Sequence, residues 1–392
     1  MGRDIRASLR VGVPALLPAA LLVNLLIQPF RAVRDAAQTD YVAYATGARL
    51  AAAGDCLYCD DRQRDAQSAL LGFPVTEGFN RFVHPALDAV LIRPFASLDL
   101  RAGLALLEVA LVICLVAAGV LLAGVLPETL PSRMRLATVI SALASLPAAW
   151  SLALGQLDAV AVLAIAGGTV VAKRGRPALG GTILAVALVK PQLVWMVPLV
   201  LAISGRREAV VGFVLGGCAF AAGCFAVAGE GIRDWVTEIA VQERTTGFGA
   251  GLSGLVTHAT SSTRIGVAVS LLVGAAGGAW TVARRRALRG DVVAAVGAGV
   301  VLSLLASPHM LQDDLLVAAV AVVALARRLP GLGLPAGIAI SLAYAVDQAL
   351  APGFALAETL VLVGLLAGCL GAFDAILPAR PFSLRQRDAV RA

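Results

Sequence analysis

Residues 101–126 read RAGLALLEVALVICLVAAGVLLAGVL, and this stretch decides the fold class. After the opening arginine it carries a single charged side chain, Glu108, and it is longer than the roughly 20 residues that a helix needs to cross a bilayer. In a soluble protein such a segment would leave a large apolar surface in water. The stretch therefore predicts a transmembrane helix.

Comparable stretches recur along the chain, whose 392 residues are 59% hydrophobic with a mean hydropathy of +0.86. We therefore predict an all-α polytopic membrane protein with a single integral membrane domain over 1–392 and about 12 transmembrane helices. The expected spans are 11–28, 101–126, 136–151, 156–172, 177–189, 191–203, 209–228, 264–283, 290–306, 310–326, 333–350 and 355–377. The pairs 136–151/156–172 and 177–189/191–203 are expected to form hairpins of short helices.

The distribution of charge predicts the topology. The first span follows the basic Met1–Arg10 segment and is expected to be a retained signal anchor. If 85–98 lies on the membrane surface and does not cross, the basic loops and both termini share one side with 20 Lys and Arg against 6 Asp and Glu. The other side has 12 against 19. The positive-inside rule then places both termini in the cytoplasm of a plasma-membrane protein, with 29–100 and 229–263 as extracytoplasmic loops. The net charge of +7 reflects this topology and does not indicate nucleic-acid binding.

Two of the six cysteines form a C-x-x-C in the first extracytoplasmic loop. No second pair completes a zinc site, so a local disulfide between Cys56 and Cys59 is the expected state outside the cytoplasm. A redox-active pair is the alternative. The other four cysteines lie in apolar spans and are expected to pack as small residues.

Four groups of short motifs follow one another between about residues 30 and 315. They are Asp40-Tyr41-x-x-Tyr44 with Gly54-x-x-x-Tyr58; Phe82-Val-His84-Pro85 with Arg93-Pro94-Phe95; Leu154-Gly155-Gln156-x-Asp158 with Lys190-Pro191-Gln192; and Ser307-Pro308-His309 with Asp313-Asp314. In this order they resemble the GT-C membrane glycosyltransferases, specifically glycosyltransferase family 87, the polyprenyl-phosphate-mannose-dependent alpha-1,2-mannosyltransferase-like group. His84-Pro85-Ala86 stands where that family more usually has Tyr-Pro-Pro, and Asp158 stands where it often has Asn. Both departures leave the acceptor preference open.

The resemblance implies a GT-C fold with surface helices in the first extracytoplasmic loop. It also implies transfer, with inversion, of a hexose from a polyprenyl-phosphate donor to an acceptor hydroxyl on a glycolipid, a glycan or a protein. Mannose is the sugar that the family suggests first, and arabinofuranose is the alternative. The partners are then the lipid-linked donor, the acceptor and membrane lipids. No cofactor or metal is expected, because the donor is a substrate and fixed cations can neutralise its monophosphate.

Asp40 stands at the start of the first long polar segment, where a carboxylate suits chemistry at the bilayer surface. The resemblance makes it the general base that takes the proton of the attacking hydroxyl. The simpler interpretation is that Asp40 caps the helix that follows it. Asp55 is the weaker alternative base.

The leaving phosphate gains negative charge, so cations aimed at it would stabilise the transition state. Lys190 is a lone cation in a long apolar run and is the first candidate. The alternative is that its side chain only snorkels to the lipid headgroups. His309 lies at a Pro-containing helix entry and is the second candidate. The alternative is that it only caps this helix. Arg264, at the start of a span, is the third.

The expected sugar-binding and acceptor-binding residues are the remaining polar members of the motifs. Asp313 and Asp314 point about 100° apart on a helix, so one of them is expected to pair with Lys190 or to contact sugar hydroxyls. Gln156 and Asp158 are expected to bind sugar or to orient Lys190. An aromatic sugar platform would include Tyr41, Tyr44, Tyr58 and His84, although interfacial packing explains tyrosines equally well.

Two other classes of protein share some of these features. Intramembrane charges and broken helices also occur in lipid and solute transporters, but the sequence lacks an inverted repeat. A noncatalytic envelope assembly protein on a GT-C scaffold is the second rival, since a fold does not establish an activity.

Overall fold

A computed structural model describes residues 2–76, 79–231, 233–235, 237, 251–350 and 355–374, without the side chains of 2–15 and 230. Every regular element in these ranges is a helix. Five are long and apolar enough to cross a membrane: α1 (Gly2–Arg34), α5 (Leu100–Val125), α11 (Arg207–Ala228), α14 (Thr263–Ala283) and α18 (Gly333–Leu350). The pair α6 (Ser132–Leu143) and α7 (Leu146–Leu154), bent by 48°, makes a sixth if it counts as one span. The twelve crossings therefore stay a prediction.

The other apolar helices are shorter, and several are interrupted. They are α8 (Asp158–Lys173), α9 (Pro177–Leu184) with η2 (Ala185–Val189), η3 (Pro191–Leu193), α10 (Val197–Ile203), α16 (Val292–Ala306), η5 (Asp313–Ala318) with α17 (Ala319–Arg328), and α19 (Leu356–Cys369). The chain breaks between η2 and η3 at Lys190, because Pro191 has no amide proton and disfavours a helical residue before it.

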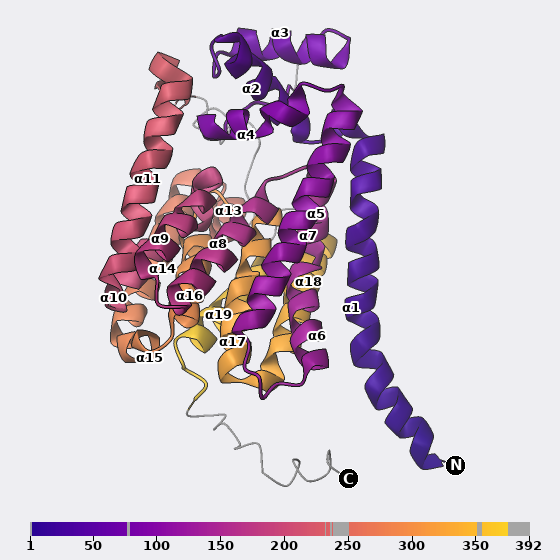
Figure 1. The fold of residues 1–392 in the computed structure, drawn as a ribbon, viewed down its shortest axis with the longest axis vertical. Coiled ribbons are helices and arrows are strands. Elements are labelled where there is room, and N and C mark those ends of the chain that lie inside the picture. The colour runs from indigo at the N-terminus through magenta and orange to yellow at the C-terminus, as the bar shows by residue number, and fades with distance from the viewer. Residues whose placement is uncertain are drawn as a thin grey trace.

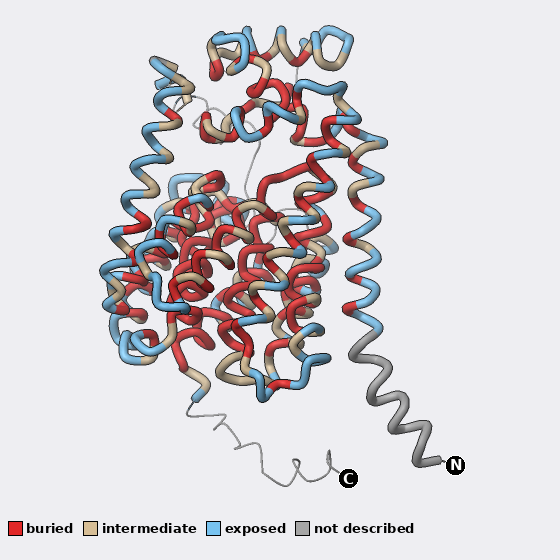
Figure 2. Tube along the Cα trace, in the orientation of Figure 1, coloured by how far each residue is buried: buried red, intermediate tan, exposed pale blue. Residues whose placement is uncertain are grey.

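The centre of the bundle is formed by helices that are apolar on every side. All 15 residues of α16 are buried, and so are the residues of α17 as far as Ala326. In Figure 2 these helices form the buried interior, while α1 and α11 lie at the periphery with many exposed residues. The outward residues include large apolar side chains such as Val120 and Leu215, a surface that suits lipid tails better than water.

The first polar segment folds into short helices at one end of the bundle (Figure 1). These are η1 (Ala36–Gln38), α2 (Tyr41–Ala53), α3 (Asp60–Leu71) and α4 (Ala86–Ala96). α4 occupies most of the ambiguous 85–98 stretch, but its 11 residues are too few to cross a bilayer, and it packs against α2. This placement agrees with the predicted surface helix.

The basic loops meet at the opposite end, around α15 (Arg285–Arg289) (Figure 1). Lys173 Nζ and the Arg327 guanidinium both donate to the carbonyl oxygen of Val125. In the same region Arg206 donates to the carbonyl oxygen of Arg289. Loops that are far apart in the sequence are thus brought together at one end, as the charge pattern predicts. The remaining described elements are η4 (Gly229–Gly231), α13 (Gly251–Thr260) and η6 (Pro330–Leu332).

Close packing of α9 on α11 gives a test of the fold. A Cβ atom at Gly212 would overlap the carbonyl oxygen of Ala178, whereas one at Gly278 would meet no atom within 4 Å. We expect Gly212→Ala to destabilise the protein by about 1–3 kcal/mol, because the two backbones must separate. Gly278→Ala should leave the stability unchanged or raise it slightly. Thermal unfolding in detergent measures both, and equal midpoints would contradict this packing.

Candidate active site

Asp40 occupies the N-cap position of α2, but its carboxylate accepts no hydrogen bond from the helix amides. Instead Oδ1 accepts a hydrogen bond of 2.9 Å from Asn80 Nδ2, and Oδ2 accepts one from Gln156 Nε2. The Asp40 backbone N–H donates to the carbonyl oxygen of Leu154 at 2.9 Å. The capping interpretation therefore fails for the side chain, and Asp40 is tied to segments far away in the sequence.

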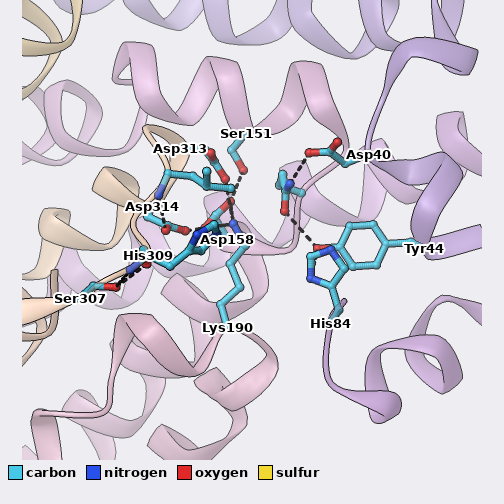
Figure 3. A network of polar contacts seen from close by, with 12 residues as sticks. Asp40, Tyr44, His84, Ser151, Asp158, Lys190, Ser307, His309, Asp313 and Asp314 are labelled. Carbon is cyan, nitrogen blue, oxygen red and sulfur yellow. Dashed lines mark hydrogen bonds and ion pairs between the residues drawn. The ribbon is translucent and has the colours of Figure 1, made fainter. Parts of the chain in front are cut away.

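A chain of polar groups continues from Gln156 through Tyr44 to His84, and Figure 3 labels the last two. The Tyr44 hydroxyl donates to Gln156 Oε1 at 3.0 Å and lies 3.2 Å from His84 Nδ1. The rings of Tyr44 and His84 stack with their centroids 4.1 Å apart. The Tyr58 hydroxyl donates to the backbone oxygen of His84 at 2.9 Å. We call Asp40, Asn80, Gln156, Tyr44 and His84 the Asp40 cluster.

Asp40 and Asp88 are the two carboxyls of this region, and burial raises the pKa of both, but only Asp40 has hydrogen-bond donors among the described residues. Burial raises the pKa of Asp88, on α4, well above its ordinary value, and neither of its oxygens accepts a hydrogen bond from a described residue. Burial also raises the pKa of Asp40, and the charge of Asp313 adds to that effect, but the hydrogen bonds from Asn80 and Gln156 oppose it. Asp40 is thus the half-buried carboxyl that is provided with donors for its ionised form.

Burial lowers the pKa of His84 to about 3, and the charges of Lys190 and His309 act in the same direction. The imidazole is therefore neutral at physiological pH. His84 as a residue is only half-buried, so part of it remains accessible.

A second group of charges lies deeper. Lys190 Nζ donates to both oxygens of Asp158 at 2.9 Å, to Asp313 Oδ2 at 2.8 Å and to Asp314 Oδ1 at 3.0 Å. The lysine is 2% exposed. Both aspartates of the Asp313-Asp314 pair thus contact Lys190, where the sequence predicted one. We call these four residues the Lys190 cluster.

The Lys190 cluster holds three carboxylates for one ammonium group. Ser151 Oγ donates to Asp158 at 2.8 Å, and the backbone N–H of Leu311 donates to Asp314 at 2.9 Å. Carboxylate oxygens of the three aspartates lie within 4.8 Å of one another, a spacing that suits a metal ion. However, the Lys190 ammonium contacts all three and takes the place that a cation would need. It is likewise unavailable to a donor phosphate while these contacts hold.

One turn joins the two clusters. Gly155 ends α7 with a φ of 72°, a left-handed conformation that suits glycine, and the Gln156 N–H bonds back to the Ser151 carbonyl oxygen at 3.0 Å. Gln156 then joins the Asp40 cluster, and Asp158, the first residue of α8, joins the Lys190 cluster. The Gly155-Gln156-x-Asp158 motif thus contributes one residue to each of the two clusters.

Other predicted residues lie outside both clusters. Tyr41 is buried, its hydroxyl lies beside Gly103 of α5, and it has no hydrogen-bond partner among the described residues. Arg264 is exposed at the start of α14 and forms no hydrogen bond or ion pair with a described residue of either cluster. Asp55 is exposed, with an oxygen 3.6 Å from Arg62.

His309 is half-buried, and its backbone N–H donates to Ser307 Oγ at 3.2 Å. Figure 3 draws it on the same side of the network as Asp314. Cys56 and Cys59 form a disulfide, so their sulfurs are not free to bind a metal.

Sequence reasoning missed Asn80 and Ser151, which hold Asp40 and Asp158. Neither belongs to a pattern with a mechanistic spacing. The only available signal was the position of Asn80 two residues before Phe82-Val-His84.

A comparison with family models matches residues 82–308, more than half of the chain, to glycosyltransferase family 87. The chain belongs to glycosyltransferase family 87. The match includes His84, Gln156, Asp158 and Lys190, while Asp40 and Asp313 lie outside it. No curated protein and no solved structure matches this family 87 member.

The charge imbalance of the Lys190 cluster leads to a prediction about stability. Lys190→Met would leave three buried carboxylates without a cation, and we expect it to cost about 3–5 kcal/mol of folding free energy. Asp313→Asn removes one excess negative charge and keeps an oxygen that can accept from Lys190, so we expect a change within about 1 kcal/mol. Thermal unfolding of the two variants measures the difference. Equal damage by both would mean that all three carboxylates are required in their charged form.

Proposed function

We propose that this family 87 glycosyltransferase moves a hexose, with mannose as the first candidate, from a polyprenyl-phosphate donor to an acceptor hydroxyl with inversion. The observation that carries the proposal is the Asp40 carboxylate. It is not used as a helix cap, it is half-buried, and it is held by two side-chain amides. Such a group is placed to accept a proton and is provided with donors that keep it ionised.

In the proposed reaction the acceptor oxygen attacks the anomeric carbon while its proton passes to Asp40. The bond from that carbon to the phosphate oxygen breaks, and the electron pair leaves with the polyprenyl phosphate. The acceptor is a glycolipid or another glycan. The lipid chain would keep the donor in the membrane next to α2 and α4. The reaction would then need no nucleotide-linked sugar at this face.

The growing charge on the phosphate requires a donor or cation other than Lys190, because the three carboxylates occupy its ammonium group. We assign this role to His309, which is half-buried and lies four residues before Asp313 in the sequence. Arg264 is a second candidate through its exposure at a span terminus. Gln156, Tyr44 and His84 line the sugar side.

The extracytoplasmic location of this site is part of the proposal. It is supported by the distance between the two ends of the bundle, since the short helices of 29–100 lie opposite the basic loops (Figure 1). The positive-inside rule favours those loops in the cytoplasm of a plasma-membrane protein. Donors linked to nucleotides are confined to that side, so a lipid-linked sugar fits the opposite one.

Transfer by purified protein in lipid tests the base. We would supply radiolabelled polyprenyl-phosphate-mannose with a pool of native membrane glycolipids, and compare wild type with Asp40→Asn and Asp55→Asn. Asp40→Asn should lose at least about 100-fold in rate, because an amide cannot take the proton. Asp55→Asn should transfer at the wild-type rate.

Full activity in Asp40→Asn would remove Asp40 from the role of base. A wild-type protein that is inactive with the mannose donor would next receive the arabinofuranose donor. Inactivity with both would contradict the proposed function and favour the transporter or the assembly protein.

The amide donors of Asp40 predict a pH effect. Asn80→Ala removes a hydrogen bond to the carboxylate, so it should raise the pKa of Asp40 further above its ordinary value. Asp40 must be ionised to act, and activity is lost as the pH falls through its pKa. The acid limb of the pH–rate profile should therefore move up by about one pH unit. Gln38→Ala removes an exposed amide close to Asp40 in sequence and should leave the profile in place.

A further inference from the structure

The ionised carboxylate of Asp40 determines which group is the donor and which is the acceptor in each hydrogen bond of the Asp40 cluster. An ionised carboxylate only accepts, so Gln156 must turn its NH₂ group toward Asp40 and its oxygen toward Tyr44. The Tyr44 hydroxyl has one proton, which it donates to that oxygen. At its 3.2 Å contact with His84 Nδ1 the hydroxyl oxygen can then only accept.

The proton at this contact must consequently belong to His84 Nδ1. A neutral imidazole carries one N–H and one lone pair, so Nε2 is left as an acceptor. The low pKa of His84, about 3, keeps the ring neutral, and the charged groups acting on it are Lys190, His309 and Asp313. No described residue hydrogen-bonds Nε2, and His84 is only half-buried.

The ring is also held in place. Tyr44 stacks on it, and Tyr58 fixes its backbone oxygen at 2.9 Å. Trp235 Nε1 donates to the carbonyl oxygen of the preceding residue, Val83, at 2.8 Å. An acceptor atom on an immobilised ring can select for the position of a hydroxyl, because a misplaced hydroxyl would leave both partners unpaired.

We propose that His84 Nε2 accepts a hydrogen bond from a hydroxyl of the bound sugar and thereby selects which sugar enters the site. This inference rests on the proposed function. The hydroxyl comes from the donor sugar or from the acceptor sugar, and the recognition chemistry is the same in both cases. A sugar in which that hydroxyl is absent or substituted would bind more weakly.

The tautomer can be tested without any transfer assay. The chain has three histidines, so protein labelled with ¹⁵N-histidine in lipid nanodiscs gives three sets of imidazole signals, and His84→Gln identifies the His84 set by its absence. We expect protonated Nδ1 and unprotonated Nε2 for His84 at pH 7, without titration down to pH 5. A protonated Nε2 would overturn the proposal.

Titrating the same sample with substrates tests the binding step. Polyprenyl-phosphate-mannose alone should shift the His84 Nε2 signal if the donor sugar supplies the hydroxyl. Methyl α-mannoside alone should shift it if the acceptor supplies it. No shift with either probe in a protein that transfers sugar would overturn the role of His84 while leaving the proposed function intact.

Two variants separate hydrogen bonding from stacking. His84→Phe keeps a ring that can stack on Tyr44 but has no acceptor, and we expect kcat/KM to fall about 10-fold to 100-fold. His84→Gln places an amide oxygen near the Nε2 position and should recover most of that loss. Equal rates for His84→Phe and wild type would overturn the proposal. A wild-type protein that transfers nothing would instead count against the proposed function.

Discussion

The Lys190 ammonium group is the charge around which the interior of this protein is arranged, because three carboxylates surround it and it is almost completely buried. A buried ion pair contributes little net stability, but every partner must be satisfied once it is there. Asp158 begins α8, and the Asp313-Asp314 pair begins η5. Satisfying Lys190 therefore fixes where these helices start relative to the break between η2 and η3.

This constraint reaches the Asp40 cluster through one short turn. Gln156 and Asp158 are two residues apart, so a shift of Asp158 away from Lys190 would also move the amide that holds Asp40. Gly155 permits the turn, and a Cβ there would come within 3.2 Å of the Tyr41 Cβ. The placement of a polar site at the end of the bundle thus depends on charges inside the apolar core. In this view Lys190 is a positioning residue for Asp40.

The apolar periodicity and length of the segments predicted the helices well, because a bilayer permits few alternatives. The predicted span 101–126 is α5 (Leu100–Val125), and the Pro191 break appears where the sequence places it. The clusters were harder to predict. Lys190 could be recognised in the sequence as a lone cation, but its partners lie 32 and more than 120 residues away. Only the folded chain shows that these partners accept from all of its N–H donors. In the sequence nothing distinguished Asn80 from an ordinary asparagine in a loop.

The proposed base role of Asp40 and the proposed recognition at His84 have a single electrostatic origin. The buried carboxyl of Asp88 accepts no hydrogen bond from a described residue, and burial raises its pKa, whereas Asp40 has two donors. Those donors favour the ionised form, and the ionised form in turn orients Gln156, Tyr44 and His84. If Asp40 were protonated, one of its oxygens would become a donor, and the amide facing that oxygen would have to turn its own oxygen toward it. The two amide donors therefore oppose proton uptake by Asp40, whereas burial and the charge of Asp313 favour it. A base needs this balance, because it must be ionised before the attack and must hold the proton during it.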